Sequence, residues 1–161
     1  RRPPRSTLSS SSAASDVYKR QPMTMQTFVV FLIGSTYGVR LSFLTLVAYL
    51  IEGAMGLPVF AAGGGIVYLT GPTAGYLYGM TIAVAVISYF ANMGYSLSYI
   101  KSFISIIIGS IIIFALGVLY LGSIIGYSKA IQAGLLPFLP SELFKIALAV
   151  LLIPTLNKII K

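Results

Sequence analysis

Five long apolar runs constrain what this chain can fold into. They lie at about residues 24–39, 41–55, 73–92, 101–125 and 141–157. A helix needs about 20 mostly apolar residues to cross the hydrocarbon core of a bilayer, and fewer where neighbouring helices cover its ends. The alternating pattern of membrane β-strands is missing from these runs, and backbone groups in lipid must be hydrogen-bonded within the protein. The runs therefore predict an all-α fold, a polytopic transmembrane helical bundle.

The composition excludes most kinds of catalytic chemistry. Of the 161 residues, 57% are hydrophobic and only 9% are charged, which is far from the composition of soluble domains. The sequence has no cysteine and no histidine, so it lacks thiol nucleophiles, the commonest metal ligand and the usual general base. Its acidic residues are Asp16, Glu52 and Glu142 alone. We expect neither an enzyme nor a metal or redox cofactor.

The first 21 residues, "RRPPRSTLSSSSAASDVYKRQ", differ from the rest of the sequence. They are polar and serine-rich, and they contain no apolar run long enough for a signal peptide. We interpret residues 1–21 as a disordered, non-native leader and residues 22–161 as the membrane-embedded domain. Without the leader, six basic residues stand against two acidic ones and lie scattered between apolar runs. Nucleic-acid binding is therefore not expected.

The positions of the basic residues predict how the chain crosses the membrane. If the first run enters from outside, Arg40, Lys101, Lys158 and Lys161 face the cytoplasm, and only Lys129 lies in an outer loop. The positive-inside rule favours this orientation for a multi-pass membrane protein. Five spans would, however, leave the basic leader outside. We therefore expect that one N-terminal helix is missing and that the leader takes its place.

A glycine-rich stretch connects the second and third runs on the predicted outer side. Residues 56–76 read "GLPVFAAGGGIVYLTGPTAGY". Irregular backbone at membrane depth is tolerated only where protein buries it or where it lines a cavity. The glycines at 63–65 would let this loop fold back over a pocket and bring backbone N–H groups to a ligand. Pro72 and Thr73 would then open the next helix, with Thr73 as a candidate cap. A flexible connector is the alternative, but the loop is very apolar for that role.

Four segments carry a resemblance to a known family: "PMTMQTF" at 22–28, "YLIEGAMGLPVFAAGGG" at 49–65, "GPTAGYLYGM" at 71–80 and "LLPFLPSELFK" at 135–145. Together they resemble the BioY-type biotin transporters, the substrate-binding (S) components of energy-coupling factor (ECF) transporters. The resemblance implies five of the family's six helices and the high-affinity capture and uptake of biotin. It also implies a transmembrane coupling (T) subunit and ATP-binding subunits as partners, since the sequence contains no GxxxxGK[ST] motif for ATP.

Glu142 and Lys145 form the constellation most suited to binding. Residues three apart on a helix face the same side, and the family carries an acid, usually aspartate, and a lysine at this spacing. The resemblance implies that Glu142 accepts hydrogen bonds from the ureido N–H groups of biotin and that Lys145 meets an oxygen acceptor. Such charge-assisted bonds contribute about 1.5 to 3 kcal/mol each. Alternatively, Ser141 caps the helix, Glu142 complements its positive end and Lys145 reaches toward the headgroups.

Several other polar or aromatic residues could face the pocket. Gln26 and Thr45 lie within apolar runs, so they should point into the bundle, where hydrogen bonds between helices are the alternative role. Tyr68 and Tyr76 border the glycine-rich loop and could pack on a ring or anchor at the interface. Glu52 either faces the ligand or reaches water. The run at 105–117, "SIIIGSIIIFALG", is interpreted as structural. The predicted substrate-binding set is Glu142, Lys145, Gly64, Gly65, Tyr76, Thr73, Thr45 and Gln26.

Three other functions stay open from the sequence. One is an S component for a different small vitamin, because Glu142 replaces the family's usual aspartate. Another is a non-catalytic structural membrane subunit, in which the pocket would be idle. The third is a membrane enzyme that uses Glu52 and Glu142 as an acid and base pair. The lack of histidine and of any metal motif disfavours the enzyme.

Overall fold

The computed structural model describes residues 24–61 and 63–160, so the predicted leader and Lys161 lie outside the described residues. The described chain forms seven α-helices and one short 3-10 helix. In chain order these are α2 (Gln26–Thr36), α3 (Val39–Ala54), α4 (Val67–Thr70), α5 (Ala74–Asn92), η1 (Tyr95–Leu97), α6 (Tyr99–Ile125), α7 (Tyr127–Gly134) and α8 (Leu139–Ile160). The predicted all-α fold is confirmed.

Each predicted apolar run is a helix in the structure. The helices α5, α6 and α8 are long and apolar enough to cross a membrane, whereas α2 and α3 have 11 and 16 residues. The short elements α4, η1 and α7 were not predicted. The reason is clearest for α7, which begins after Gly126 at a φ of +93° and has too few apolar residues to form a run.

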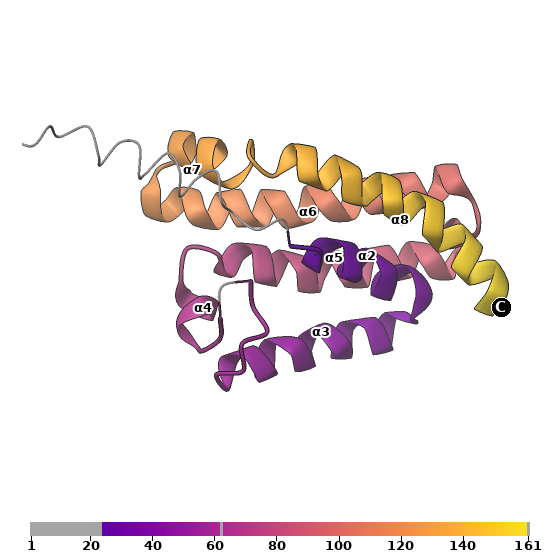
Figure 1. Ribbon diagram of the computed structural model, residues 1–161, viewed down its shortest axis with the longest axis horizontal. Helices are drawn as coiled ribbons and strands as arrows, with labels where there is room; N and C mark the ends of the chain where they lie inside the picture. Colours follow the sequence, from indigo (N-terminus) through magenta and orange to yellow (C-terminus); the bar gives the residue numbers. More distant parts are fainter. Residues whose placement is uncertain (1–23, 62, 161) are drawn as a thin grey trace, which may run out of the picture.

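The helix α5 is the centre of the bundle. It packs against α6 on one side and against α2 and α3 on the other, while α8 lies along α2 and α6 (Figure 1). The core forms where these helices meet, and Ile87 of α5 and Ile106 of α6 are fully buried in it. The glycines Gly34 and Gly109 face Ile87, where a Cβ atom at either position would press on its side chain. Small residues therefore let α2 and α6 approach α5 closely.

Buried serines fasten the turn between α2 and α3 to α5. Ser88 donates a hydrogen bond to the carbonyl oxygen of Tyr37 at 2.8 Å, and Ser42 donates to that of Ile33 at 3.0 Å. The last carbonyl groups of a helix have no partner within the helix. These hydroxyls provide partners for carbonyl groups at the end of α2 and keep the α2–α3 turn in place.

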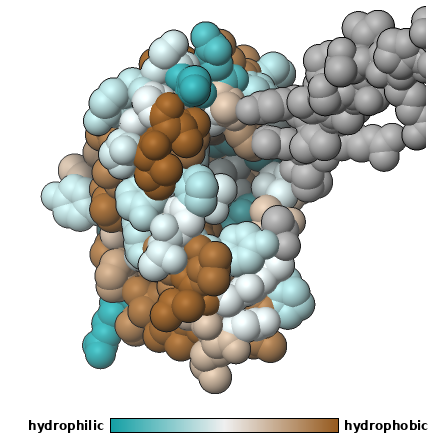
Figure 2. All heavy atoms as spheres, turned by 90° about the vertical axis from the view of Figure 1, so that its left-hand side faces the viewer, coloured by the Kyte–Doolittle hydropathy of each residue, from teal (hydrophilic) through white to brown (hydrophobic). Residues whose placement is uncertain are grey.

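The two ends of the bundle differ in charge and in regularity. Figure 1 shows α4, α7 and the irregular connections before and after them at one end. Lys129 of α7 lies there, and Figure 2 looks onto this end. The opposite end carries the α2–α3 turn with Arg40, the start of α6 with Lys101 and the end of α8 with Lys158. Arg40, Lys101 and Lys158 therefore lie together at the end that the topology prediction assigns to the cytoplasm, whereas Lys129 and Lys145 lie at the other end. We call the α4 and α7 end the outer end.

Candidate functional site

A cavity of about 450 Å³ lies at the outer end of the bundle. The first turns of α2, α5 and α8 contribute to its wall, together with α6, α7 and the connection before α4. Small-molecule sites usually enclose about 300 to 1,000 Å³ and have mostly apolar walls. The apolar part of this wall includes Leu77, Met80, Ile113, Phe114 and Phe138. The polar part consists of Thr24, Gln26, Thr27, Tyr68, Thr73, Tyr76, Glu142 and Lys145.

A buried ion pair supplies the charge in this cavity. Glu142 and Lys145 lie one turn apart at the start of α8, with Nζ of Lys145 3.5 Å from Oε2 of Glu142. Their residues are only 3% and 5% exposed. Because the helix begins at Leu139, both side chains project from its first two turns into the same cavity. The prediction that the two residues share one face is confirmed.

Two hydroxyl groups complete the cluster around Glu142. Thr27 of α2 donates a hydrogen bond to Oε2 at 2.9 Å, and Ser110 of α6 donates one to Oε1 at 3.1 Å. Lys145 in turn donates to the hydroxyl oxygen of Thr27 at 3.2 Å. Three helices that are far apart in the sequence therefore meet at one carboxylate.

The structure separates the alternative roles that the sequence left open for this cluster. Ser141 does not cap α8, because the helix begins two residues earlier and Ser141 is buried within the first turn. Lys145 does not reach toward headgroups, because its side chain is enclosed by protein. Glu142 does lie in the first turn, where a negative charge complements the positive end of the helix. That role is compatible with its position in the cavity.

The connection after α3 folds back over the bundle, as predicted. We call residues 55–61 and 63–66 the strap. Two backbone hydrogen bonds between Phe60 and Gly63, of 2.9 and 3.1 Å, close its turn, and the N–H of Gly65 donates to the carbonyl oxygen of Gly53 at 2.7 Å. Positive φ angles of +140° at Gly63 and +113° at Gly65 make this path possible.

Phe60 brings the strap to the cavity. Its ring is buried against Gly53, where a Cβ atom would overlap it, and it meets the ring of Tyr49 edge-on at 5.4 Å between centroids. Phe60 and Ala61 line the cavity, whereas Gly64 and Gly65 are not among its lining residues. Gly64 instead lies so close to the carbonyl group of Leu57 that no side chain would fit. The two glycines shape the strap, and the aromatic residue before them forms the wall.

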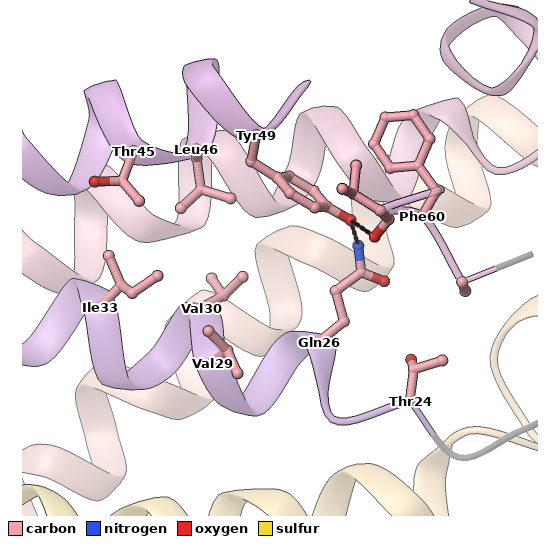
Figure 3. Close-up of a pocket in the computed structure, with 11 residues that line it drawn as sticks. Thr24, Gln26, Val29, Val30, Ile33, Thr45, Leu46, Tyr49 and Phe60 are labelled. Carbon is pink, nitrogen blue, oxygen red and sulfur yellow. Dashed lines mark hydrogen bonds between the residues drawn. The ribbon is translucent and has the colours of Figure 1, made fainter. Parts of the chain in front are cut away.

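A second cavity of about 410 Å³ lies between α2 and α3. Its wall is almost entirely apolar and shares Thr24, Gln26, Phe60 and Ala61 with the first cavity. Figure 3 shows how Gln26 and Tyr49 close the space between α2 and the strap. Nε2 of Gln26 donates a hydrogen bond to the hydroxyl of Tyr49, which donates to the carbonyl oxygen of Val59 at 3.0 Å. Gln26 therefore stands at the boundary between the two cavities.

Thr45 was predicted to bind substrate, but it lines only this second cavity. Its hydroxyl donates to the carbonyl oxygen of Leu41 in its own helix at 2.7 Å. A polar residue in an apolar helix can satisfy itself in this way without facing a polar partner on another helix. Glu52, the other uncertain residue of α3, is exposed and lines neither of the two cavities.

Tyrosine hydroxyls fix the connections at the outer end. Tyr76 lines the cavity and lies over Gly117. Its hydroxyl donates a hydrogen bond to the carbonyl oxygen of Gly134 at 2.7 Å, and this bond joins α5 to α7. Tyr78 donates to the carbonyl oxygen of Leu69 at 2.7 Å, and Tyr120 to that of Thr70 at 3.2 Å. These bonds hold the last carbonyl groups of α4 and α7.

Thr73 and Tyr68 lie where the sequence analysis expected them. Both line the cavity, and Tyr68 packs against Phe60 with 5.8 Å between ring centroids. Thr73 stands at the position before the first residue of α5, but its side chain makes no capping hydrogen bond there. The predicted cap is therefore wrong in its chemistry, although the helix boundary is right.

The sequence analysis missed Thr27 and Ser110. It interpreted the run at 105–117 as structural, yet Ser110 holds Glu142, and Ile113 and Phe114 line the cavity. A serine within a series of isoleucines was the available signal, because a polar side chain in a membrane helix usually faces protein. Thr27 offered a similar signal one residue after Gln26.

A family model described as the BioY family matches residues 8–161. The chain belongs to the BioY family. Its relatives include the probable biotin transporter BioY of Pyrococcus horikoshii, which is 37% identical over 81% of this chain and 77% of that protein. The biotin transporter BioY of Thermotoga maritima is 39% identical over 86% of this chain and 82% of that protein.

A solved structure has the same helical fold. It is the S-component for biotin from an ECF-type ABC transporter, with a TM-score of 0.76 and 22% sequence identity over 85% of this chain and 76% of that chain. Members of the BioY family are membrane transport proteins and not enzymes. With its apolar helices, this BioY chain is a multi-pass protein of the plasma membrane.

Proposed function

We propose that this chain captures biotin at the outer face of the membrane as the S component of an ECF-type transporter. The observation that carries the proposal is the buried pair of Glu142 and Lys145 in the wall of the outer cavity. The names of the relatives, which are biotin transporters, and of the S-component with the same fold support biotin as the ligand.

The polar and apolar parts of the cavity match the two parts of biotin. The ureido ring presents N–H donors and a carbonyl acceptor, which suit a carboxylate and an ammonium group respectively. Glu142 accepts from a ureido N–H group, and Lys145 donates to the ureido oxygen. The sulfur-containing ring and the aliphatic chain contact apolar residues such as Leu77, Met80 and Phe114. Tyr76 offers a ring edge or face in the same wall.

Transport requires an energy source from other subunits. The sequence carries no GxxxxGK[ST] motif for ATP. A transmembrane coupling subunit and ATP-binding subunits are therefore the proposed partners. In this scheme the chain loads from the outside, and its partners use ATP hydrolysis to move the ligand inward.

Equilibrium binding of radiolabelled biotin to the protein in lipid nanodiscs tests the proposal. We expect saturable binding by the unaltered chain and a loss of at least about tenfold in affinity for Glu142→Gln, since a hydrogen bond to a charged group contributes about 1.5 to 3 kcal/mol. Glu52→Gln is the matched control, because it makes the same change at an exposed glutamate of α3. Unchanged biotin affinity in Glu142→Gln would reject the proposed site. Saturable binding of another vitamin, with no binding of biotin, would identify a different S component.

A further inference from the structure

The carboxylate of Glu142 is already occupied by protein donors on both oxygens. Thr27 binds Oε2, and Ser110 binds Oε1. These two hydroxyls come from α2 and α6, and both residues are more than nine-tenths buried. They satisfy the buried carboxylate, which a buried ion pair requires. They also determine which of its lone pairs remain for a ligand.

The direction of each hydrogen bond in the cluster follows from the chemistry of the groups. The ammonium group of Lys145 can only donate, so the hydroxyl oxygen of Thr27 accepts from it at 3.2 Å. A carboxylate can only accept, so the hydrogen of Thr27 points to Glu142. The hydrogen of Ser110 points to the same carboxylate for the same reason. Both hydroxyl rotors are thus fixed before any ligand binds.

The hydrogen-bonding capacity that remains is small and specific. A carboxylate has about four lone-pair positions, and Thr27, Ser110 and Lys145 use three of those on Glu142. An ammonium group has three donors, and Lys145 directs two of them to Thr27 and Glu142. One acceptor and one donor remain on adjacent groups. They match a ligand group that presents one N–H and one C=O side by side.

The cluster also carries no net charge, because the carboxylate and the ammonium group neutralise each other at 3.5 Å. A charged ligand group would enter this buried site without a free counter-charge, and burying an unpaired charge is costly. An uncharged amide or urea brings no such cost.

We infer that Thr27 and Ser110 are positioning residues that make the site selective for uncharged N–H/C=O head groups, such as cyclic ureas, over amines. This inference rests on the proposed function and adds the reason for its selectivity. Together with Lys145, the hydroxyls leave Glu142 a single free lone-pair position, which one ureido N–H can use but which is too few for the several N–H groups of an ammonium ligand. Removal of either hydroxyl frees a lone pair of Glu142 for a cationic ligand. It also leaves the carboxylate less firmly oriented toward the urea.

The test compares two ligands on a set of matched variants in nanodiscs. The ligands are biotin and the diamine that remains when the ureido carbonyl of biotin is removed. Both keep the valerate carboxylate, and the head group of the diamine is positively charged at neutral pH. The unaltered chain should prefer biotin by at least about 100-fold, because an unpaired buried charge is strongly disfavoured. Thr27→Val keeps the shape of the side chain and removes the hydroxyl. It should raise the Kd for biotin at least about tenfold. It should reduce the preference for biotin by more than that factor, because the freed lone pair becomes available to the diamine.

Three further variants separate positioning from a general structural effect. Thr27→Ser retains the hydroxyl and should restore most of the affinity and the preference. Ser110→Ala removes the donor to the other oxygen, so it should act in the same direction as Thr27→Val and provides the test if that variant does not fold. Thr45→Val makes the same chemical change at a threonine that bonds within its own helix, and should leave both Kd values unchanged.

The outcomes distinguish the two proposals. If the unaltered chain binds biotin, but Thr27→Val and Ser110→Ala weaken both ligands equally or neither, the positioning role is overturned and the proposed function stands. If Thr27→Ser is as defective as Thr27→Val, the hydroxyl is not the cause, and the inference again fails. If the unaltered chain binds no biotin, the proposed function falls first, and the inference falls with it.

Discussion

The buried pair at the start of α8 should be far more sensitive to the loss of one charge than to the loss of both. Lys145→Met removes the ammonium group and leaves the carboxylate of Glu142 enclosed by protein. The double variant Glu142→Gln/Lys145→Met removes both charges and keeps side chains of similar size. We expect the single variant to be much less stable than the double variant.

The size of the difference follows from the geometry. At 3.5 Å between Nζ and Oε2, and with an effective dielectric constant of about 20, the attraction between the two charges is about 5 kcal/mol. Removing one partner of a buried pair costs about 3 to 5 kcal/mol, whereas replacing both by neutral groups is often nearly neutral. Lys145→Met should therefore lose about 3 to 5 kcal/mol of the free energy of unfolding. The double variant should stay within about 1 to 2 kcal/mol of the unaltered chain.

Denaturant unfolding in a fixed detergent, followed by tyrosine fluorescence and helical circular dichroism, measures these differences. Biotin binding provides the second readout. It should be weakened in both variants, because the single variant lacks the bond from the ammonium group and the double variant lacks both charge-assisted bonds. Equal stability of the single and the double variant would refute the reasoning, since it would mean that the charge of Glu142 is not enclosed. Retained biotin binding by the double variant would show that Glu142 and Lys145 do not bind the ligand.

Three further predictions concern the tyrosines around the cavity. Gly117→Ala should destabilise the protein by about 1 to 3 kcal/mol, because the new methyl group overlaps the ring of Tyr76; an unchanged unfolding midpoint would contradict this packing. Tyr76→Phe removes the hydrogen bond to Gly134 and should cost about 1 kcal/mol, with faster protease cleavage near α7 as the local readout. Tyr49→Phe breaks the link from Gln26 to the strap and should speed biotin dissociation in stopped-flow experiments while helical content stays constant. An unaltered dissociation rate would show that this link does not restrain the strap.

The helices of the bundle could be predicted because their cause is local. A long, mostly apolar run satisfies its own backbone hydrogen bonds in lipid as a helix, so α5, α6 and α8 were recognisable without knowledge of their neighbours. The short helix α7 has a different origin. It forms between Gly126 and the turn at Leu135 and depends on contact with α6, which no run length encodes.

The part of the candidate site that lies on one helix could be predicted from the sequence, whereas the part that depends on contacts between helices could not. Glu142 and Lys145 face the same cavity because a single helix sets their relation, and the spacing alone indicated it. Thr27 and Ser110 reach Glu142 from helices 115 and 32 residues away along the chain. Their role depends on how three helices pack, and a polar residue in an apolar run shows only that it should face protein.

For Gly64, Gly65 and Thr45, a local property of the residue did not determine what the residue contacts. The conformational freedom of Gly64 and Gly65 correctly indicated a chain that folds back, but the backbone freedom of a residue does not determine what its N–H groups face. Thr45 was expected to point into the bundle, yet its hydroxyl is satisfied one turn earlier in the same helix. In both cases the structure shows a role for the residue within the protein itself.

The tyrosine bonds at the outer end have a consequence for how the cover of the cavity can move. Four tyrosine side chains on α3, α5 and α6 each donate a hydrogen bond to one carbonyl group of the strap, α4 or α7: Tyr49, Tyr76, Tyr78 and Tyr120. A single neutral hydrogen bond contributes only about 1 kcal/mol, and the strap is also held by the packing of Phe60 against Gly53 and Tyr49. The cover of the cavity is therefore anchored to the helices at several separate points, and the loss of one tyrosine hydroxyl should loosen one anchor and leave the others in place.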